Sequence, residues 1–179
     1  MNKELVVADK IEPFVVQTLR DEKRNIPDAA RPFWHLQFRR FAGCPICNLH
    51  LQSFVKQIDR IQEGGIHELV FFHSSAEEMS LYQHQLPFDV VADPEKNWYR
   101  RFGVGESIRA IFDPRSWLAG VQGIMSGNSD VAQAGGGRLG LPADFLVNGE
   151  GRIVALKYGL HADDQWSVDE LLTHAARRS

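Results

Sequence analysis

The fold of this chain is decided by the stretch Arg39-Arg40-Phe41-Ala42-Gly43-Cys44-Pro45-Ile46-Cys47-Asn48-Leu49-His50. It holds the only two cysteines among 179 residues, in a Cys-x-x-Cys spacing. A bulky apolar run at 33–38 precedes it, and apolar residues at helical spacing follow it from 51 to 61. A strand that leads through Cys-x-x-Cys into a helix is typical of a redox site at a helix N-terminus. We therefore predict a strand, a short loop and a helix whose first turn carries both cysteines.

The composition excludes several classes of function. Apolar residues make up 44% and charged residues 24% of the chain, as in ordinary soluble globular proteins. The net charge of −3 offers no bulk attraction to nucleic acid or to an anionic membrane. No apolar run approaches the roughly 20 residues of a membrane span. No secretory signal is visible, so we expect a cytoplasmic protein whose two cysteines are catalytic or metal-binding rather than structural.

Periodicity and turn signals predict strands and helices on both sides of the cysteines. Pro45 suits the first helical position, where its missing N–H costs nothing. Ser75 with Glu78 and Ser167 with Glu170 form capping boxes, each of which predicts a helix start. In chain order we expect an N-terminal hairpin between 11 and 26, a strand at 33–38, a helix at 45–63, a strand at 69–72, a helix to about 85, a strand at 88–92, a helix at 95–102, strands at 143–147 and 152–157 joined by a turn at 148–151, and a helix to about 177.

This order implies one α/β domain over residues 1–179. The first inner strands alternate with helices and are expected to be parallel, whereas the late hairpin adds antiparallel strands. The result is a central mixed sheet flanked by helices. Residues 1–12 form a polar lead-in, and 103–140 form an irregular insertion before the hairpin, with a triple glycine.

The element order and three segments resemble the peroxiredoxin-like (AhpC/TSA-type) proteins of the thioredoxin superfamily. The segments are 38–47, 88–94 together with 99–104, and 142–154, and the resemblance extends over residues 13–174. It implies a thioredoxin-like three-layer fold and an antioxidant or thiol-disulfide oxidoreductase, with Cys44 as the reactive thiol and Pro142 as a cis-proline beside it. It also implies a peroxide or disulfide substrate, an external reductant of the thioredoxin or glutathione type, and a homodimer.

The chain departs from the family's peroxide site at two positions. Typical peroxiredoxins carry Pro-x-x-x-Thr-x-x-Cys, in which the threonine hydroxyl holds the peroxide. The corresponding residues here are Gln37 and Phe41. This difference favours a protein disulfide as the substrate.

The spacing of the cysteines predicts a division of labour between them. A helix N-terminus stabilises Cys44 as the thiolate, which is the nucleophilic form of a thiol. Cys47 lies one turn later on the same face, where it can close a disulfide. We expect Cys44 to attack the substrate and Cys47 to resolve the product, with no bound cofactor. Arg39 or Arg40 would lower the pKa of Cys44 or bind an anionic substrate, and Pro45 helps to set the redox potential.

Other hypotheses stay open at this point. Cys-Pro-x-Cys also begins zinc ribbons, but a second cysteine pair is missing, so a metal would need histidines such as His50, and we expect none. A thioredoxin-fold interaction module or redox sensor would use the same fold without catalysis. His35 and His73, on or after inner strands, are candidate proton shuttles, and Asp144 is the carboxylate to test for proximity to Cys47.

Overall fold

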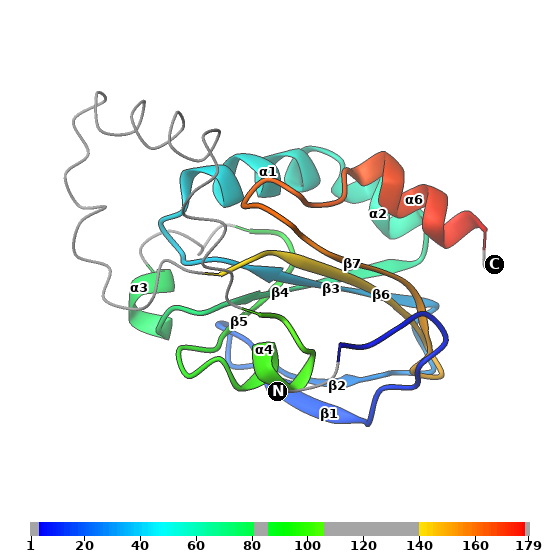
Figure 1. The fold of residues 1–179 in the computed structure, drawn as a ribbon. Coiled ribbons are helices and arrows are strands. Elements are labelled where there is room, and N and C mark those ends of the chain that lie inside the picture. Colours follow the sequence, from blue (N-terminus) through cyan, green and yellow to red (C-terminus); the bar gives the residue numbers. More distant parts are fainter. Residues whose placement is uncertain (1–3, 81–85, 106–139, 178–179) are drawn as a thin grey trace.

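The structure is a computed structural model that describes residues 4–80, 86–105 and 140–177. A five-stranded mixed sheet forms the centre of this part of the chain (Figure 1). The strand order is β5-β4-β3-β6-β7. Strands β3, β4 and β5 are parallel, whereas β6 is antiparallel to β3 and β7 is antiparallel to β6. The strands are β3 (Phe33–Arg39), β4 (Ile66–Phe72), β5 (Asp89–Ala92), β6 (Ala143–Asn148) and β7 (Ile153–Tyr158).

Helices and a small hairpin cover the two faces of this sheet (Figure 1). One face carries α1 (Pro45–Lys56), α2 (Ile58–Glu63) and α6 (Val168–Ala176). The other face carries α4 (Asn97–Arg101) and the antiparallel hairpin of β1 (Phe14–Gln17) and β2 (Lys23–Ile26), while α3 (Ala76–Ser80) follows β4. This is the central mixed sheet flanked by helices that the element order predicts, and the N-terminal hairpin is confirmed.

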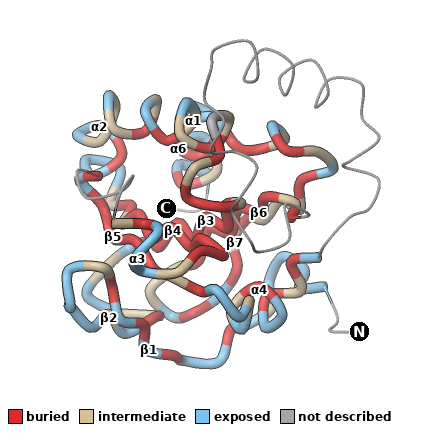
Figure 2. The backbone as a smooth tube through the Cα atoms, turned by 90° about the vertical axis from the view of Figure 1, so that its left-hand side faces the viewer, coloured by how far each residue is buried: buried red, intermediate tan, exposed pale blue. Residues whose placement is uncertain are grey.

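The sheet separates two apolar cores, and Figure 2 shows its strands as the most buried part of the chain. Val70 and Phe72 of β4 point toward the core beneath α1 and α6, where Phe54 also lies. Leu69 and Phe71 point to the opposite core, beneath the hairpin and α4. A strand buried on both faces needs a continuous apolar run, which explains why 33–38 and 69–72 have bulky residues at successive positions.

The turn and cap signals of the sequence form as expected. The side-chain oxygen of Asn148 accepts hydrogen bonds from the N–H groups of Glu150 and Arg152 and thereby closes the turn between β6 and β7. Ser167 and Glu170 make a complete capping box at the start of α6. The Ser75 and Glu78 pair makes the same reciprocal bonds ahead of α3.

Two helix predictions need correction. The single helix expected at 45–63 is interrupted at Gln57, whose backbone (φ −119°, ψ 18°) separates α1 from α2. Ile61, beyond the break, is fully buried, so the change of direction keeps α2 against the sheet. The helix expected at 95–102 is the shorter α4, because the Asp93 carboxylate accepts hydrogen bonds from the N–H groups of Asn97 and Trp98 and so begins the helix later.

Some expectations fall outside the described residues. The end of the helix expected to reach about residue 85 falls within 81–85. Nearly all of the insertion expected at 103–140 falls within 106–139. Within the described ranges, the chain has no helix that is both long and apolar enough to span a membrane.

Candidate active site

Cys44 lies at the N-terminus of α1, where the chain leaves β3 and turns into the helix. Its backbone is extended (φ −69°, ψ 113°), and its carbonyl accepts the hydrogen bond of the Asn48 N–H at 3.0 Å. Cys47 follows in the first helical turn. Both cysteines are free thiols, and their exposed fractions are only 1% and 0%. This is the strand–loop–helix unit that the Cys-x-x-Cys stretch predicts.

The environment of Cys44 favours the thiolate. The pKa of Cys44 is lowered from 9.0 to about 6, and the largest cause is a hydrogen bond from the Cys47 thiol. Burial acts in the opposite direction, but weaker favourable interactions add to this hydrogen bond. These weaker interactions, which also lower the pKa of Cys44, come from the backbone N–H groups of Cys47 and Ile46 and from the charge of Arg40. At neutral pH Cys44 is therefore the ionised member of the pair, and the thiolate is the nucleophilic form of a cysteine.

Cys47 has the opposite character. Its hydrogen bond to Cys44, its burial and the negative charge on Cys44 raise the pKa of Cys47 well above 9.0. The backbone N–H of Arg40 and the charge of Arg39 counteract this rise. In the reduced protein the pair thus holds one proton, which stays on Cys47.

Apolar side chains surround the two sulfur atoms. Phe41 is buried with Cys44 and Cys47 in one cluster, and Ile46 packs against it. The guanidinium carbon of Arg40 lies 5.6 Å from the centre of the Phe41 ring. At the position where a threonine hydroxyl would hold a peroxide, this chain has an aromatic ring under an arginine.

The loop before Cys44 is held by residues that follow β4 and by a side chain of α1. The hydroxyl of Ser74 accepts a hydrogen bond from the Ala42 N–H at 3.1 Å, and the side-chain amide of Asn48 donates to the Ala42 carbonyl at 3.3 Å. The His73 N–H donates to the Arg40 carbonyl at 3.2 Å. These bonds fix the approach of the chain to the first turn of α1.

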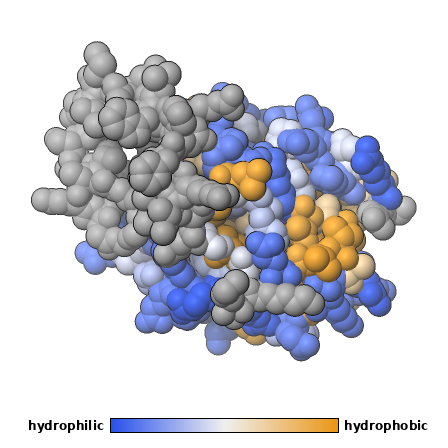
Figure 3. All heavy atoms as spheres, in the orientation of Figure 1, coloured by the Kyte–Doolittle hydropathy of each residue, from blue (hydrophilic) through white to orange (hydrophobic). Residues whose placement is uncertain are grey.

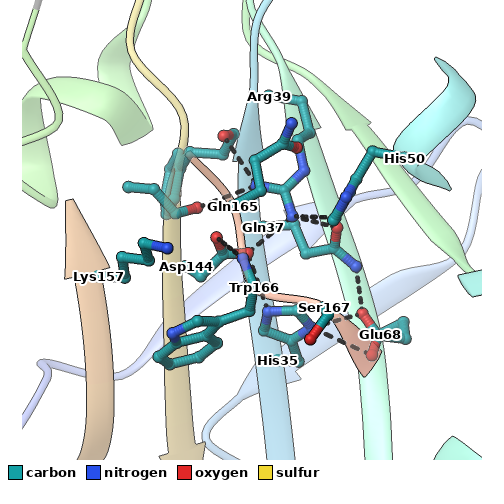
Figure 4. Close-up of polar contacts among 12 residues, drawn as sticks. His35, Gln37, Arg39, His50, Glu68, Asp144, Lys157, Gln165, Trp166 and Ser167 are labelled. Atoms are coloured by element: carbon teal, nitrogen blue, oxygen red, sulfur yellow. Dashed lines mark hydrogen bonds and ion pairs between the residues drawn. The ribbon is translucent and has the colours of Figure 1, made fainter. Parts of the chain in front are cut away.

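A buried network of charged side chains extends along the sheet from this site (Figure 4). Arg39 Nη2 donates to the carboxylate of Asp144 at 2.7 Å and to the side-chain oxygen of Gln37 at 2.6 Å. His35 lies between two carboxylates, 2.8 Å from Glu68 and 3.1 Å from Asp144. Gln37 donates its amide to Glu68. The side chains of Arg39, His35, Glu68 and Asp144 are completely buried.

The charges within this network balance. Burial lowers the pKa of His35, but Glu68 and Asp144 outweigh burial and raise it to about 9, so that His35 is a cation at neutral pH. Burial raises the pKa of Asp144, but Arg39 and His35 outweigh burial and hold it below its ordinary value. Two cations therefore face two carboxylates. Burial and the charge of Arg39 lower the pKa of His50 to about 3, so this neighbouring residue is neutral.

The structure separates the polar residues that the sequence placed near the cysteines. Arg40 acts on Cys44, as expected. His35 is engaged by Glu68 and Asp144 in the network, and Asp144 binds Arg39, His35 and the Trp166 N–H. These contacts give His35 and Asp144 a role in the network.

His73 lies at the end of β4. Its ring centre is 6.5 Å from that of Phe41 and 5.8 Å from that of Tyr99. Of the two histidines considered as proton shuttles, His73 is thus the one that lies beside the apolar cluster of the cysteines.

The expectation of a cis-proline at 142 is wrong in this structure. Within the described ranges the cis peptide bond is Ile26–Pro27, and the bond before Pro142 is trans. Trans is the lower-energy form of an X–Pro bond, and the extended conformation favoured before proline leads directly into β6. The Pro142 carbonyl accepts a hydrogen bond from the Gly159 N–H at 2.8 Å, and a Cβ added to Gly159 would lie 2.8 Å from Pro142 Cγ.

Several residues of the site were missed by reasoning from the sequence. Glu68 had a usable signal, because an acidic residue inside an apolar strand needs a buried partner. Ser74 and Tyr99 had none, since both are ordinary residues whose partners lie far away in the chain. The Tyr99 hydroxyl contacts the carbonyl oxygens of Arg39 and Phe71 and so joins α4 to the ends of β3 and β4.

The zinc hypothesis finds no donor set in the part of the chain that the structure describes. No three of its His, Cys, Asp and Glu side chains lie together as metal ligands. The Nε2 atom of His50 lies 3.4 Å from the guanidinium of Arg39 and accepts its hydrogen bond. That atom faces a cation, which is the opposite of what a metal ligand requires.

A mixed sheet flanked by helices, with a dithiol at the N-terminus of the helix after an inner strand, defines the thioredoxin-like class of proteins. A family model described as AhpC/TSA antioxidant enzyme matches residues 50–159, which is more than half of the chain. The chain belongs to this family. It is therefore an oxidoreductase, either a peroxiredoxin-like antioxidant or a thiol-disulfide oxidoreductase. The match begins at His50, after both cysteines, so the family assignment does not depend on them.

Solved structures show the same fold at low sequence identity. The peroxidoxin BcpB from Mycobacterium tuberculosis is 10% identical with a TM-score of 0.71, and 97% of each chain is covered. A peroxiredoxin-like protein from Aquifex aeolicus is 14% identical with a TM-score of 0.69, over 98% of this chain and 89% of that one. A putative thiol:disulfide interchange protein, DsbE from Chlorobium tepidum, is 15% identical with a TM-score of 0.63, over 96% and 99%. A comparison with curated protein sequences finds no match.

The ionisation of Cys44 gives a first testable prediction. Alkylation of the reduced protein by iodoacetamide, measured between about pH 4 and pH 9, is expected to be half-maximal near pH 6, because only the thiolate reacts. In Cys47→Ala the midpoint is expected to rise, since the largest stabilising hydrogen bond is removed. Arg40→Met removes a nearby positive charge and leaves the Cys47 hydrogen bond in place, so it is expected to raise the midpoint of Cys44 alkylation by a smaller amount. A wild-type midpoint near the ordinary cysteine value of about 8.5 would contradict the arrangement.

Proposed function

We propose that this protein is a dithiol oxidoreductase in which Cys44 is the nucleophile and Cys47 is the resolving thiol of a Cys44-Pro45-Ile46-Cys47 active site. The observation that supports this most directly is the asymmetry of the pair. Cys44 is stabilised as the thiolate at a helix N-terminus, while Cys47 keeps its proton one turn away. An inert pair of buried thiols has no need for such a difference.

The reaction follows from this asymmetry. The Cys44 thiolate attacks a disulfide, forming a mixed disulfide and releasing one thiolate, or it attacks a peroxide, forming a sulfenic acid and releasing an alkoxide or hydroxide. Cys47 then loses its proton and attacks the Cys44 sulfur. A Cys44–Cys47 bond forms, and the leaving thiolate or hydroxide takes up a proton. Two electrons pass from the dithiol to the substrate. An external thiol of the thioredoxin or glutathione type then reduces the Cys44–Cys47 disulfide back to the dithiol.

The surroundings of the site favour a disulfide as the substrate. Phe41 provides no hydroxyl to hold a peroxide, and the cluster of Phe41 and Ile46 is apolar. Leu49, two residues after Cys47, is 77% exposed and offers an apolar contact to a protein partner. The face shown in Figure 3 is mainly hydrophilic, with separate apolar patches. A cytoplasmic location, where a thiol reductant is abundant, and a homodimer belong to the same proposal.

The substrate assay is the second prediction. Reduced protein is mixed in turn with hydrogen peroxide, an organic hydroperoxide and insulin, and its intact mass is recorded. The proposal expects conversion to the disulfide form, which is two hydrogen atoms lighter, with reduction of insulin disulfides faster than reaction with either peroxide. A dithiol that reacts with all three no faster than a free small thiol would refute the proposed catalytic function and favour an interaction module. Light scattering of the same sample tests the homodimer.

A further inference from the structure

We propose that Arg39 is a positioning residue for the resolving step, because its buried guanidinium stabilises the Cys47 thiolate once Cys44 has reacted. The inference rests on the proposed function, in which Cys47 attacks the sulfur of the modified Cys44. It assigns a part in the reaction to a network that otherwise serves only the fold.

Arg39 is held rigidly at the end of β3. Its Nη1 donates to the carbonyl oxygens of Phe38 at 3.4 Å and Ala143 at 3.5 Å. Its Nη2 donates to Gln37 at 2.6 Å and Asp144 at 2.7 Å (Figure 4). The side chain is completely buried, so water screens its charge poorly.

The same guanidinium reaches the helix that carries the cysteines. Arg39 Nη2 lies 3.4 Å from Nε2 of His50, which is one turn after Cys47 on the same face of α1. The backbone carbonyl of Arg39 accepts a hydrogen bond from the Tyr99 hydroxyl. The phenol of Tyr99 is close enough to Cys47 for the two groups to interact electrostatically. Arg39 therefore joins β3, β6 and α1 on the helix face that carries Cys47.

The chemical state of Cys44 decides when this charge matters. In the reduced protein, the hydrogen bond to Cys44 and the negative charge of Cys44 both keep the proton on Cys47. Once Cys44 carries a mixed disulfide or a sulfenic acid, that negative charge is gone. Burial then remains as the influence that opposes ionisation of Cys47, while the Arg40 N–H and, to a smaller extent, the charge of Arg39 favour it. The first step thus activates the second.

The charged and titratable groups near Cys47 come from several elements. Cys44 and His50 belong to the α1 segment, Arg40 to the loop before it, Tyr99 to α4, His73 to the end of β4, and Asp144 to β6 behind Arg39. His50 is neutral at physiological pH, and burial raises the pKa of Tyr99 well above 10. Asp144 is spent on Arg39 and His35. Arg39 is thus the cation that acts on Cys47, whereas the charge of Arg40 acts on the thiolate of Cys44.

The test separates the two chemical steps with a small aromatic disulfide that releases a coloured thiolate. The first equivalent appears when Cys44 forms the mixed disulfide, and the second appears when Cys47 displaces the aromatic thiol. Arg39→Met with Asp144→Asn removes the cation without leaving a buried carboxylate unpaired. We expect the second phase at pH 7 to slow about tenfold or more, and to recover at higher pH, while the first phase changes little. Arg39→Lys is expected to retain most of the second phase.

A matched control comes from another arginine–aspartate pair. Arg24 Nε binds Asp89 at 2.6 Å, and Asp89 is at the start of β5, away from the carboxyl ends of the strands where the cysteines lie. Arg24→Met with Asp89→Asn is expected to leave both phases unchanged. Equal slowing in this control, or an unchanged second phase in the Arg39 variant, would overturn the proposal.

A measurement without Arg39 substitutions covers the case in which those variants do not fold. In Cys44→Ala the hydrogen bond and the negative charge of Cys44 are absent, so alkylation of Cys47 is expected to be half-maximal at a lower pH than in the wild-type protein. An unchanged midpoint for Cys47 would overturn the inference. Failure of the proposed function looks different, because the wild-type protein would then release no rapid first equivalent of coloured thiolate.

Discussion

Cys44→Ser is expected to abolish thiol-dependent turnover, with a loss on the order of a thousandfold or more, because no other group replaces the nucleophile. Cys47→Ser is expected to lose turnover as well but to retain the first chemical step. Its adduct on Cys44, a mixed disulfide or an added oxygen, then accumulates because nothing resolves it. Intact mass after one equivalent of oxidant distinguishes the two variants.

The matched pair of serine variants also protects this result against a trivial cause. Both cysteines are buried in the same cluster, so both substitutions disturb packing to a similar extent. If loss of activity came from misfolding, both variants would be silent toward the oxidant. Rapid turnover by Cys44→Ser would show that Cys44 is not the nucleophile.

Asp144→Asn is expected to lower the free energy of unfolding by about 3–5 kcal/mol, the usual cost of removing one partner of a buried ion pair. Asp144 neutralises Arg39 at 2.7 Å and His35 at 3.1 Å, and all three side chains are completely buried. Urea unfolding at pH 7 measures the loss. Asp164→Asn breaks the half-exposed Lys157–Asp164 pair and is expected to cost less than about 1 kcal/mol. Equal costs in the two variants would contradict a structural role for the network.

The same unfolding experiment has an expected dependence on pH. His35 has a raised pKa, so its stabilising contribution is complete below its ordinary value of 6.5 and is lost as the pH rises through about 9. Asp144 has a lowered pKa, so its contribution is complete above its ordinary value of 3.8 and is lost as the pH falls further below it. The contribution of this network to wild-type stability is therefore greatest between about pH 4 and pH 6.5. In Asp144→Asn the loss of stability on either side of this pH range is expected to be smaller.

Local signals in the sequence located the redox stretch and most elements around it. Cys44 and Cys47 at three-residue spacing, the capping boxes and the turn at 148–151 are short-range features whose physical causes act within a few residues. They predicted the strand–loop–helix unit, the hairpins and the mixed sheet. The break at Gln57 had no local signal, because it is set by packing of α2 against the sheet.

Only the tertiary structure decided how the polar residues are divided. His35, Asp144 and Arg39 were all candidates near the cysteines, yet His35 and Arg39 meet Asp144 across 109 and 105 residues of chain. Strand register alone places Gln37 opposite Asp144 and His35 opposite Glu68. Residue type shows that a buried charge needs a partner, but the partner is selected by the order and register of strands that are distant in sequence. The candidate dithiol could therefore be located from the sequence, while the pairing of the buried charges could not.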